Sequence, residues 1–165
     1  MTYQIRRVQQ GDAAALAAVQ TSSWKAAFRG ILSDSDLERL TNIEKAAAMY
    51  QGLLAEGKGN GYIGEIDGKA HCIAYWDSAR DADMPQCAEI ICIHSLPDNW
   101  RKGFGGQMMD RILSDISQAG FKKVVLWVFT ENSRARVFYE AKGFQPTDKI
   151  KPVLGTTEIC YEKEI

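Results

Sequence analysis

A strand, an amphipathic helix and a second strand follow one another between residues 88 and 129. At 100° per residue, the apolar helix positions lie within an arc of about 140°: Gly105, Met108, Met109, Ile112, Leu113 and Ile116. Residues 123–129 are almost continuously apolar, as is typical of a strand buried on both faces. Strand, helix and strand in this order form a right-handed βαβ unit in nearly all known cases. The sequence therefore predicts an α/β domain built around this unit.

The segments on either side predict further strands and helices. Residues 3–9 indicate a first strand, and an apolar stripe from Leu16 to Phe28 indicates a helix that the polar residues 21–23 could interrupt. Ser35 and Glu38 have capping-box spacing, which predicts a second helical region that runs to about residue 55. Further strands are expected at 61–66, 69–76, 145–151 and 156–163, and a last helix at 133–142. We expect one α/β (α+β) domain over residues 1–165, with a mixed, mostly antiparallel sheet of about seven strands and flanking helices.

Composition and charge exclude several classes of protein. A net charge of −1 with scattered basic residues gives no footprint for a long nucleic acid, so no nucleic-acid partner is expected. The N-terminal segment has no apolar run long enough for a signal peptide or membrane anchor, which favours a cytoplasmic protein without a membrane partner. Four cysteines without a C-x-x-C pair indicate reduced thiols, and two isolated histidines are too few for a metal site.

A glycine-rich turn lies between the strand at 88–95 and the amphipathic helix. Gly103, Gly105 and Gly106 let the backbone approach a ligand closely, and the first N–H groups of the helix then point into the turn. Arg101 and Lys102 add cationic side chains at its rim. This combination suits a phosphate or pyrophosphate, although a tight connection that only happens to be rich in glycine would have the same composition.

Two common phosphate-binding motifs do not fit this turn. A P-loop needs a Lys-Ser or Lys-Thr pair after its glycines, and none follows here. A dinucleotide-binding turn would have Gly or Ala where this chain has Met108, and it belongs early in an all-parallel sheet. A third class of ligand is therefore favoured.

Two segments resemble the signatures of the GNAT superfamily of acetyl-CoA-dependent N-acetyltransferases. The turn, with Pro97 before it and Met108 and Met109 after it, is similar to the acetyl-CoA loop [QR]-x-x-G-x-[GA]. Residues 131–144 resemble the signature N-x-x-A-x-x-F-Y-x-x-x-G-F and match all of its fixed positions. The order of strands and helices is also similar from residue 3 to the end. One departure is Trp100, which stands at the Gln/Arg position, with Arg101 displaced by one.

The resemblance implies a GNAT fold and acetyl-CoA as the co-substrate, with no metal. It implies that backbone N–H groups from Arg101 to Gly106 hold the pyrophosphate, and that the strand edge at Ile93 and Ser95 pairs with the pantetheine amides. It also implies that the amide of Ile93 polarises the thioester carbonyl. The last helix would contact the cofactor along its path. The cofactor-binding residues expected from this comparison are Ile93, Ser95, Arg101, Lys102, Gly103, Phe104, Gly105, Gly106, Asn132, Ala135 and Phe138.

Acetyl transfer to an amine also needs a proton donor and a proton acceptor. By the resemblance, Tyr139 is expected to protonate the leaving thiolate, and its position at the edge of an apolar helix face allows a buried ring with an accessible hydroxyl. The resemblance also implies that Glu89, fourteen residues before Gly103, is the base. Strand alternation would place it on one face with Ile91, Ile93 and Ser95. His94 and a water path are left open as alternatives.

Trp24 and Phe28 lie where the family usually builds its acceptor pocket, so they are the expected substrate-binding residues. The expected reaction is direct attack of a primary amine, on a small molecule or a protein, on the acetyl thioester. Two rival functions remain open: a non-catalytic acyl-CoA sensor and a nucleotide-binding regulatory domain. The sequence leaves the identity of the amine and the formation of a homodimer undetermined.

Overall fold

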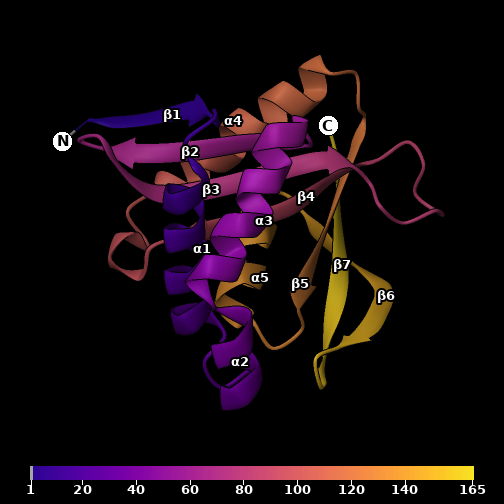
Figure 1. Ribbon diagram of the computed structural model, residues 1–165. Helices are drawn as coiled ribbons and strands as arrows, with labels where there is room; N and C mark the ends of the chain where they lie inside the picture. The colour runs from indigo at the N-terminus through magenta and orange to yellow at the C-terminus, as the bar shows by residue number, and fades with distance from the viewer. Residues whose placement is uncertain (1) are drawn as a thin grey trace.

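The computed structural model describes residues 2–165, which form one seven-stranded sheet in the order β1-β2-β3-β4-β5-β7-β6 (Figure 1). Within it β4 and β5 are parallel, and all other neighbouring strands are antiparallel. This confirms the predicted mixed, mostly antiparallel sheet with a central βαβ unit. The strands are β1 (Tyr3–Arg7), β2 (Asn60–Ile66), β3 (Lys69–Ser78), β4 (Ala88–Ser95), β5 (Lys123–Phe129), β6 (Gln145–Val153) and β7 (Thr156–Glu164).

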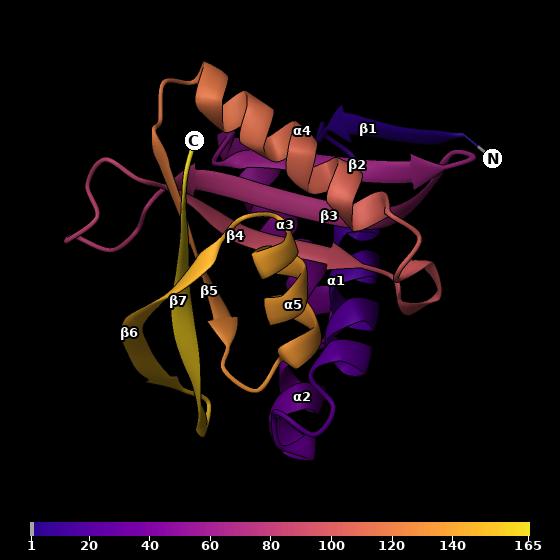
Figure 2. The same cartoon turned by 180° about the vertical axis from the view of Figure 1, so that it is seen from behind.

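Helices cover both faces of the sheet. In Figure 1, α1 and α3 lie in front of the sheet with α2 below them, and Figure 2 shows α4 and α5 on the opposite face. No helix within residues 2–165 is long and apolar enough to cross a membrane. The helices are α1 (Ala13–Ala27), α2 (Asp34–Leu40), α3 (Ile43–Glu56), α4 (Phe104–Gln118) and α5 (Ser133–Ala141).

The predicted helical region from Ser35 to about residue 55 is helical, but it is divided into two helices, and its first cap is Ser33 and not Ser35. The Ser33 hydroxyl caps α2 by accepting the Asp36 N–H at 3.1 Å. The Asn42 side chain caps α3 by accepting the Lys45 N–H at 2.9 Å. Two caps nine residues apart start two helices, because each cap satisfies N–H groups that a continuous helix would bond internally. By contrast, residues 21–23 do not interrupt α1.

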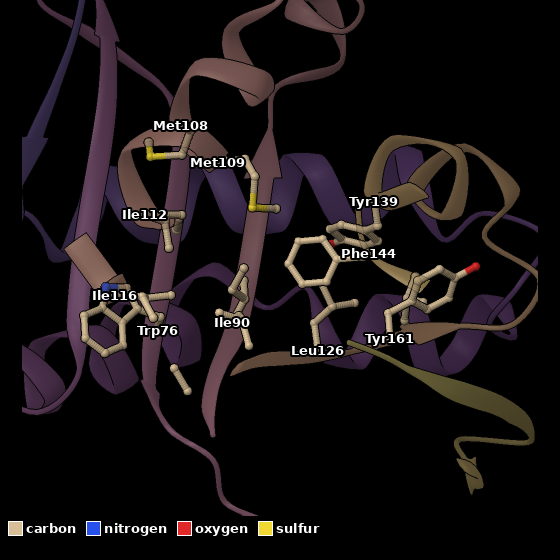
Figure 3. Packing of buried hydrophobic residues seen from close by; sticks show 14 of the residues in the cluster. Trp76, Ile90, Met108, Met109, Ile112, Ile116, Leu126, Tyr139, Phe144 and Tyr161 are labelled. Atoms are coloured by element: carbon tan, nitrogen blue, oxygen red, sulfur yellow. The ribbon is translucent and has the colours of Figure 1, made fainter. Parts of the chain in front are cut away.

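The largest core cluster lies on the α4 and α5 face of the sheet. The apolar stripe of α4, which includes Met108, Met109, Ile112 and Ile116, packs against Ile90 and Trp76 (Figure 3). Further along, Tyr139 of α5 meets the rings of Phe144 and Tyr161 (Figure 3). Burial of each such side chain stabilises the fold by about 1.5–3 kcal/mol. These contacts hold α5 against the sheet at the end where β4 and β5 separate.

The separation of β4 and β5 positions the functional site. The two strands pair only from Ala88 to Ile90, opposite Val124 to Leu126. Beyond these residues they diverge, as Figure 2 shows, and residues 91–95 of β4 have no strand partner on the β5 side in the part of the chain that the structure describes. The middle of the sheet therefore contains an unpaired strand edge.

Candidate active site

A cleft of about 820 Å³ opens where β4 and β5 separate. Its wall combines β4, β5 and α5 with the C-terminal half of α1. A cavity of this size and mixed lining is typical of a small-molecule site. It brings together many of the predicted site residues: Trp24, Phe28, Ile93, Ser95, Arg101, Asn132, Ala135, Phe138 and Tyr139.

The unpaired edge of β4 presents backbone groups to this cleft. The Leu96 N–H donates to the His71 carbonyl of β3 at 2.8 Å, and in an antiparallel pair every second residue bonds to the neighbouring strand. Ile93 and Ser95 therefore direct their N–H and C=O groups away from β3. The Ser95 carbonyl accepts the Trp100 indole N–H at 2.9 Å, which agrees with this orientation. A ligand in the cleft can thus bond to the β4 backbone as an added strand would.

The glycine turn lies at the N-terminus of α4, next to this edge. Gly103 is the N-cap residue with a φ of 84°, a left-handed conformation that favours glycine. The first bond of the helix runs from the Gln107 N–H to the Gly103 carbonyl at 3.1 Å, so the N–H groups of residues 104–106 have no partner in the helix. A β-carbon at Gly105 would lie 3.6 Å from the Phe138 ring, which places the turn against α5. The turn therefore has the N–H groups and the helix dipole of an anion site. The Phe104 side chain packs on Tyr3, away from the cleft, and only its backbone serves the turn.

Trp100 and Arg134 form a contact across the rim of the cleft. The Arg134 guanidinium lies 3.5 Å from the centre of the Trp100 ring, a cation–π distance. Both residues line the cleft and also a neighbouring hollow of about 500 Å³. Trp100 thus replaces the Gln or Arg of the loop pattern with a flat ring that stacks on an arginine of α5.

Tyr139 lies on the cleft wall with its ring buried. Its ring is in contact with Phe138, Phe144 and Tyr161, and its hydroxyl makes no hydrogen bond with any residue from 2 to 165. Burial raises the pKa of Tyr139 well above its usual value, so the phenol stays protonated at neutral pH. This side chain offers a proton or a hydrogen bond to a ligand in the cleft.

Glu89 does not share the predicted face with Ile93, and the base role expected for it stays a prediction that this position does not support. It is 1% exposed, lies outside the cleft wall, and accepts hydrogen bonds from the Arg80 backbone and guanidinium at 2.7–3.2 Å. The cause is a β-bulge: Tyr75 pairs with Cys92 and Trp76 with Ile90, so one residue of β4 between them is unmatched. The extra residue reverses the alternation of faces, and Glu89 no longer shares a face with Ile93.

His94 lines the cleft, but its geometry is not that of a base. The Trp24 indole N–H donates to His94 Nε2 at 2.9 Å. Because an indole nitrogen only donates, Nε2 is unprotonated and the neutral ring carries its proton on Nδ1. Burial, with a smaller effect from Arg134, lowers the pKa of His94 to about 4. The imidazole is therefore a neutral ring with an N–H to donate.

A known family of proteins matches the segments that form this cleft. The model of the acetyltransferase (GNAT) family matches residues 21–144, from α1 through the glycine turn to the end of the second signature. The chain belongs to the GNAT acetyltransferase family. It is 27% identical to a probable N-acetyltransferase of Mycobacterium tuberculosis over 85% of this chain and 78% of the relative. It is also 27% identical to an uncharacterized N-acetyltransferase of Archaeoglobus fulgidus, over 86% of this chain and 92% of that relative.

Solved structures share the fold of this acetyltransferase. The paiA N-acetyltransferase from Thermoplasma acidophilum, solved in complex with coenzyme A, is similar with a TM-score of 0.83 and 19% identity over all of both chains. The yncA acetyltransferase from Salmonella typhimurium, solved with acetyl-CoA, has a TM-score of 0.75 and 18% identity, and covers 99% of this chain and 94% of its own.

Sequence reasoning missed the wall of the acetyltransferase cleft that lies opposite β4. Trp127 and Phe129 of β5, Leu154 of the β6–β7 hairpin and Glu158 of β7 all line it. The aromatic residues at every second position of β5 were a usable signal, because they share one strand face. Glu158 had no such signal, since its place depends on the register of β7. Within residues 2–165 no group of His, Cys, Asp and Glu side chains is arranged to hold a metal ion.

Proposed function

We propose that the chain transfers an acetyl group from acetyl-CoA to a primary amine by direct attack, with residues 1–165 acting as one catalytic domain. The observation that carries this proposal is the unpaired edge of β4, which leads from the glycine turn at α4 to the cleft beside Tyr139. Each of these three features suits one part of acetyl-CoA: the strand edge suits the peptide-like arm, the turn suits the phosphate groups, and the tyrosine suits the leaving thiol. The relatives solved with coenzyme A and acetyl-CoA support the same substrate.

The residues of the cleft and of the glycine turn suit acetyl-CoA in three places. The free N–H groups of residues 104–106 and the cationic rim suit the pyrophosphate. The outward N–H and C=O groups of Ile93 and the N–H of Ser95 suit the amides of the pantetheine arm. The Ser95 carbonyl is already bonded to Trp100, so that indole must move if the arm is to use this oxygen. Ala135 and Phe138 provide apolar contacts along the α5 side.

The chemistry of transfer follows from groups on the cleft wall. The free amine attacks the thioester carbonyl, and an N–H of the β4 edge, which we assign to Ile93, stabilises the developing oxyanion. Tyr139 then protonates the departing sulfur, whose free thiol has a pKa of about 8.5 by analogy with cysteine. The amine loses its proton to solvent or to a carboxylate in the cleft, since Glu89 is bound to Arg80 and His94 Nε2 is bound to Trp24.

The test is a thiol-release assay with acetyl-CoA and a panel of primary amines, with the acetylated product identified by mass. Calorimetry with acetyl-CoA accompanies it. Acetyl-CoA binding together with amine-dependent thiol release supports the proposal. Binding without transfer to any amine would favour the acyl-CoA sensor instead, and absence of acetyl-CoA binding would overturn both. A cytoplasmic setting suits the four free cysteines, and it stays a prediction, as does a homodimer.

A further inference from the structure

The wall of the cleft opposite β4 carries a carboxylate next to an aromatic face. Phe129 of β5 pairs with Glu158 of β7, and Trp127 is two residues before Phe129, so the three side chains lie on the same face of the sheet. Glu158 is the only acidic side chain among the described residues that line the cleft. Its side chain is 21% exposed, so it is partly withdrawn from water. This wall therefore has a single, defined site for a cation.

The protein's own Lys151 already places an ammonium group in this site. Its Nζ atom lies 4.0 Å from the centre of the Trp127 ring and 3.6 Å from Oε1 of Glu158. The second distance is too long for a hydrogen bond, so the carboxylate keeps its full accepting capacity. The Lys151 side chain is 43% exposed and belongs to the edge strand β6, which allows it to leave. The arrangement shows that an aromatic face and a carboxylate here suit an alkylammonium ion.

The surroundings of this cation site are apolar. The neighbouring part of the wall is formed by Trp24 and Phe28 of α1, Phe129, and Val153 and Leu154 of the β6–β7 hairpin. The rings of Phe28 and Phe129 meet edge to face at 4.8 Å, which makes a continuous aromatic surface. An acceptor bound here would place a carbon skeleton against these side chains.

From these contacts we infer that the acceptor is an alkylamine which arrives as an ammonium cation on an apolar carbon body, and that Glu158 and Trp127 receive the ammonium group in the place now taken by Lys151. This inference rests on the proposed acetyl transfer to an amine. It makes Glu158 a substrate-binding residue and Lys151 a competitor for the same site.

Two substitutions with opposite expected effects test the inference, with hexylamine as the acceptor. Glu158→Gln removes the charge that binds the ammonium and should raise KM for hexylamine about tenfold. Lys151→Ala removes the competitor and should lower KM about twofold or more, because a larger fraction of the protein is ready to bind. Glu162→Gln and Lys149→Ala are the matched controls, since each removes the same charge from an ion pair outside the cleft, and neither should change KM. If Lys151→Ala raises KM as Glu158→Gln does, the pair is structural and the inference is wrong.

A binding experiment separates this inference from the proposed function. Calorimetry on the protein saturated with coenzyme A compares hexylamine with hexanol, which has the same carbon chain and no positive charge. We expect hexylamine to bind at least tenfold more tightly, and Glu158→Gln to abolish the difference. Equal binding of the two compounds, or binding of neither, overturns the ammonium subsite even if other amines are acetylated. Preferential binding of hexylamine, with no thiol release by hexylamine or by any other amine of the panel, would instead keep the subsite and refute the transfer reaction.

Discussion

The Trp24 indole donates its only N–H to Nε2 of His94 across a distance of 2.9 Å, and this bond joins α1 to β4 beside the cleft. Since the bond is made to the lone pair of Nε2, it stabilises the neutral ring and opposes its protonation. Burial acts in the same direction on the pKa of His94. The imidazole is thus held neutral at any pH at which the enzyme would work.

The neutral state of His94 makes the stability of the fold depend on pH. Its pKa is about 4 in the folded protein and about 6.5 when unfolded. Between these values the unfolded state binds more protons, so the contribution of His94 to the free energy of unfolding should be constant above pH 6.5 and fall as the pH drops toward 4, by up to about 3 kcal/mol. Urea unfolding of the wild type and His94→Gln across this range measures the effect. Gln can still accept the Trp24 N–H, and the variant should lose most of the slope. The slope that remains comes from His71, whose pKa burial also lowers, and from carboxyl groups with lowered pKa values such as that of Asp12 beside Arg6. An equal slope in both proteins would contradict the assignment.

The pair of Glu89 and Arg80 should act on stability and not on the pH dependence of catalysis. Arg80→Ala leaves a buried carboxylate without its cation and should cost about 3 kcal/mol. Glu89→Gln leaves a neutral buried group and should cost about 1–2 kcal/mol. Denaturant unfolding gives both values, and Arg39→Ala, from an exposed pair with Asp36, should cost less than about 1 kcal/mol. The acidic limb of the kcat/KM profile should be the same in Glu89→Gln as in the wild type; a shifted limb would restore Glu89 as the base.

Gly103 should be needed for acetyl-CoA binding and not only for folding. Its φ of 84° disfavours a β-branched residue, and Val there would strain the turn that presents the N–H groups of α4. Gly103→Val should therefore weaken acetyl-CoA binding at least tenfold by calorimetry, or about 1.4 kcal/mol. Gly11→Val is the matched control, with a φ of 98° and open space around the site of a β-carbon. Both variants should lose similar stability, and equal loss of acetyl-CoA affinity in both would refute a specific role for the turn.

Tyr139→Phe should separate chemistry from folding. The ring and its contacts with Phe144 and Tyr161 remain, and the lost hydroxyl has no hydrogen-bond partner within residues 2–165, so Tm should change little. Acetyl-CoA affinity should change by no more than the 0.5–1.5 kcal/mol of about one hydrogen bond. The single-turnover rate of acetyl transfer should fall by about 10²–10⁴, the usual effect of losing a positioned acid. A full rate in the variant would remove Tyr139 from the mechanism.

Local sequence signals predicted the elements and much of the cleft. The Asp67-Gly68 turn correctly predicted the β2–β3 hairpin, because its geometry depends on two adjacent residues. The signature at residues 131–144 predicted a helix whose residues, among them Asn132, Ala135 and Phe138, line the cleft, because such a motif is short and local. The glycine turn correctly predicted the start of α4, and its role in binding stays a prediction.

The errors came from relations between segments that are far apart in the sequence. The place of Glu89 depends on an extra residue in β4, which is defined only by its pairing with β3, and strand alternation cannot reveal it. Glu158 enters the cleft because β7 pairs with β5 opposite Phe129, and nothing near residue 158 indicates this register. The break between α2 and α3 did have a local signal, because Asn42 is a residue type that often caps a helix. The apolar pattern on both sides of Asn42 nevertheless favoured one continuous helical region.

The unpaired edge of β4 also bears on aggregation. A strand edge with free N–H and C=O groups promotes aggregation, since another chain can add a strand to it. At the border of a sheet, proteins protect such edges with charged side chains, proline, bulges or covering segments. Here the edge lies in the interior of the sheet, with β5 and α5 on one side and α1 behind it. A narrow ligand arm can enter this gap, whereas an extended strand of a second molecule, with side chains on both faces, would clash with these elements. The fold thus presents these backbone groups inside a cleft and not at the outer border of the sheet.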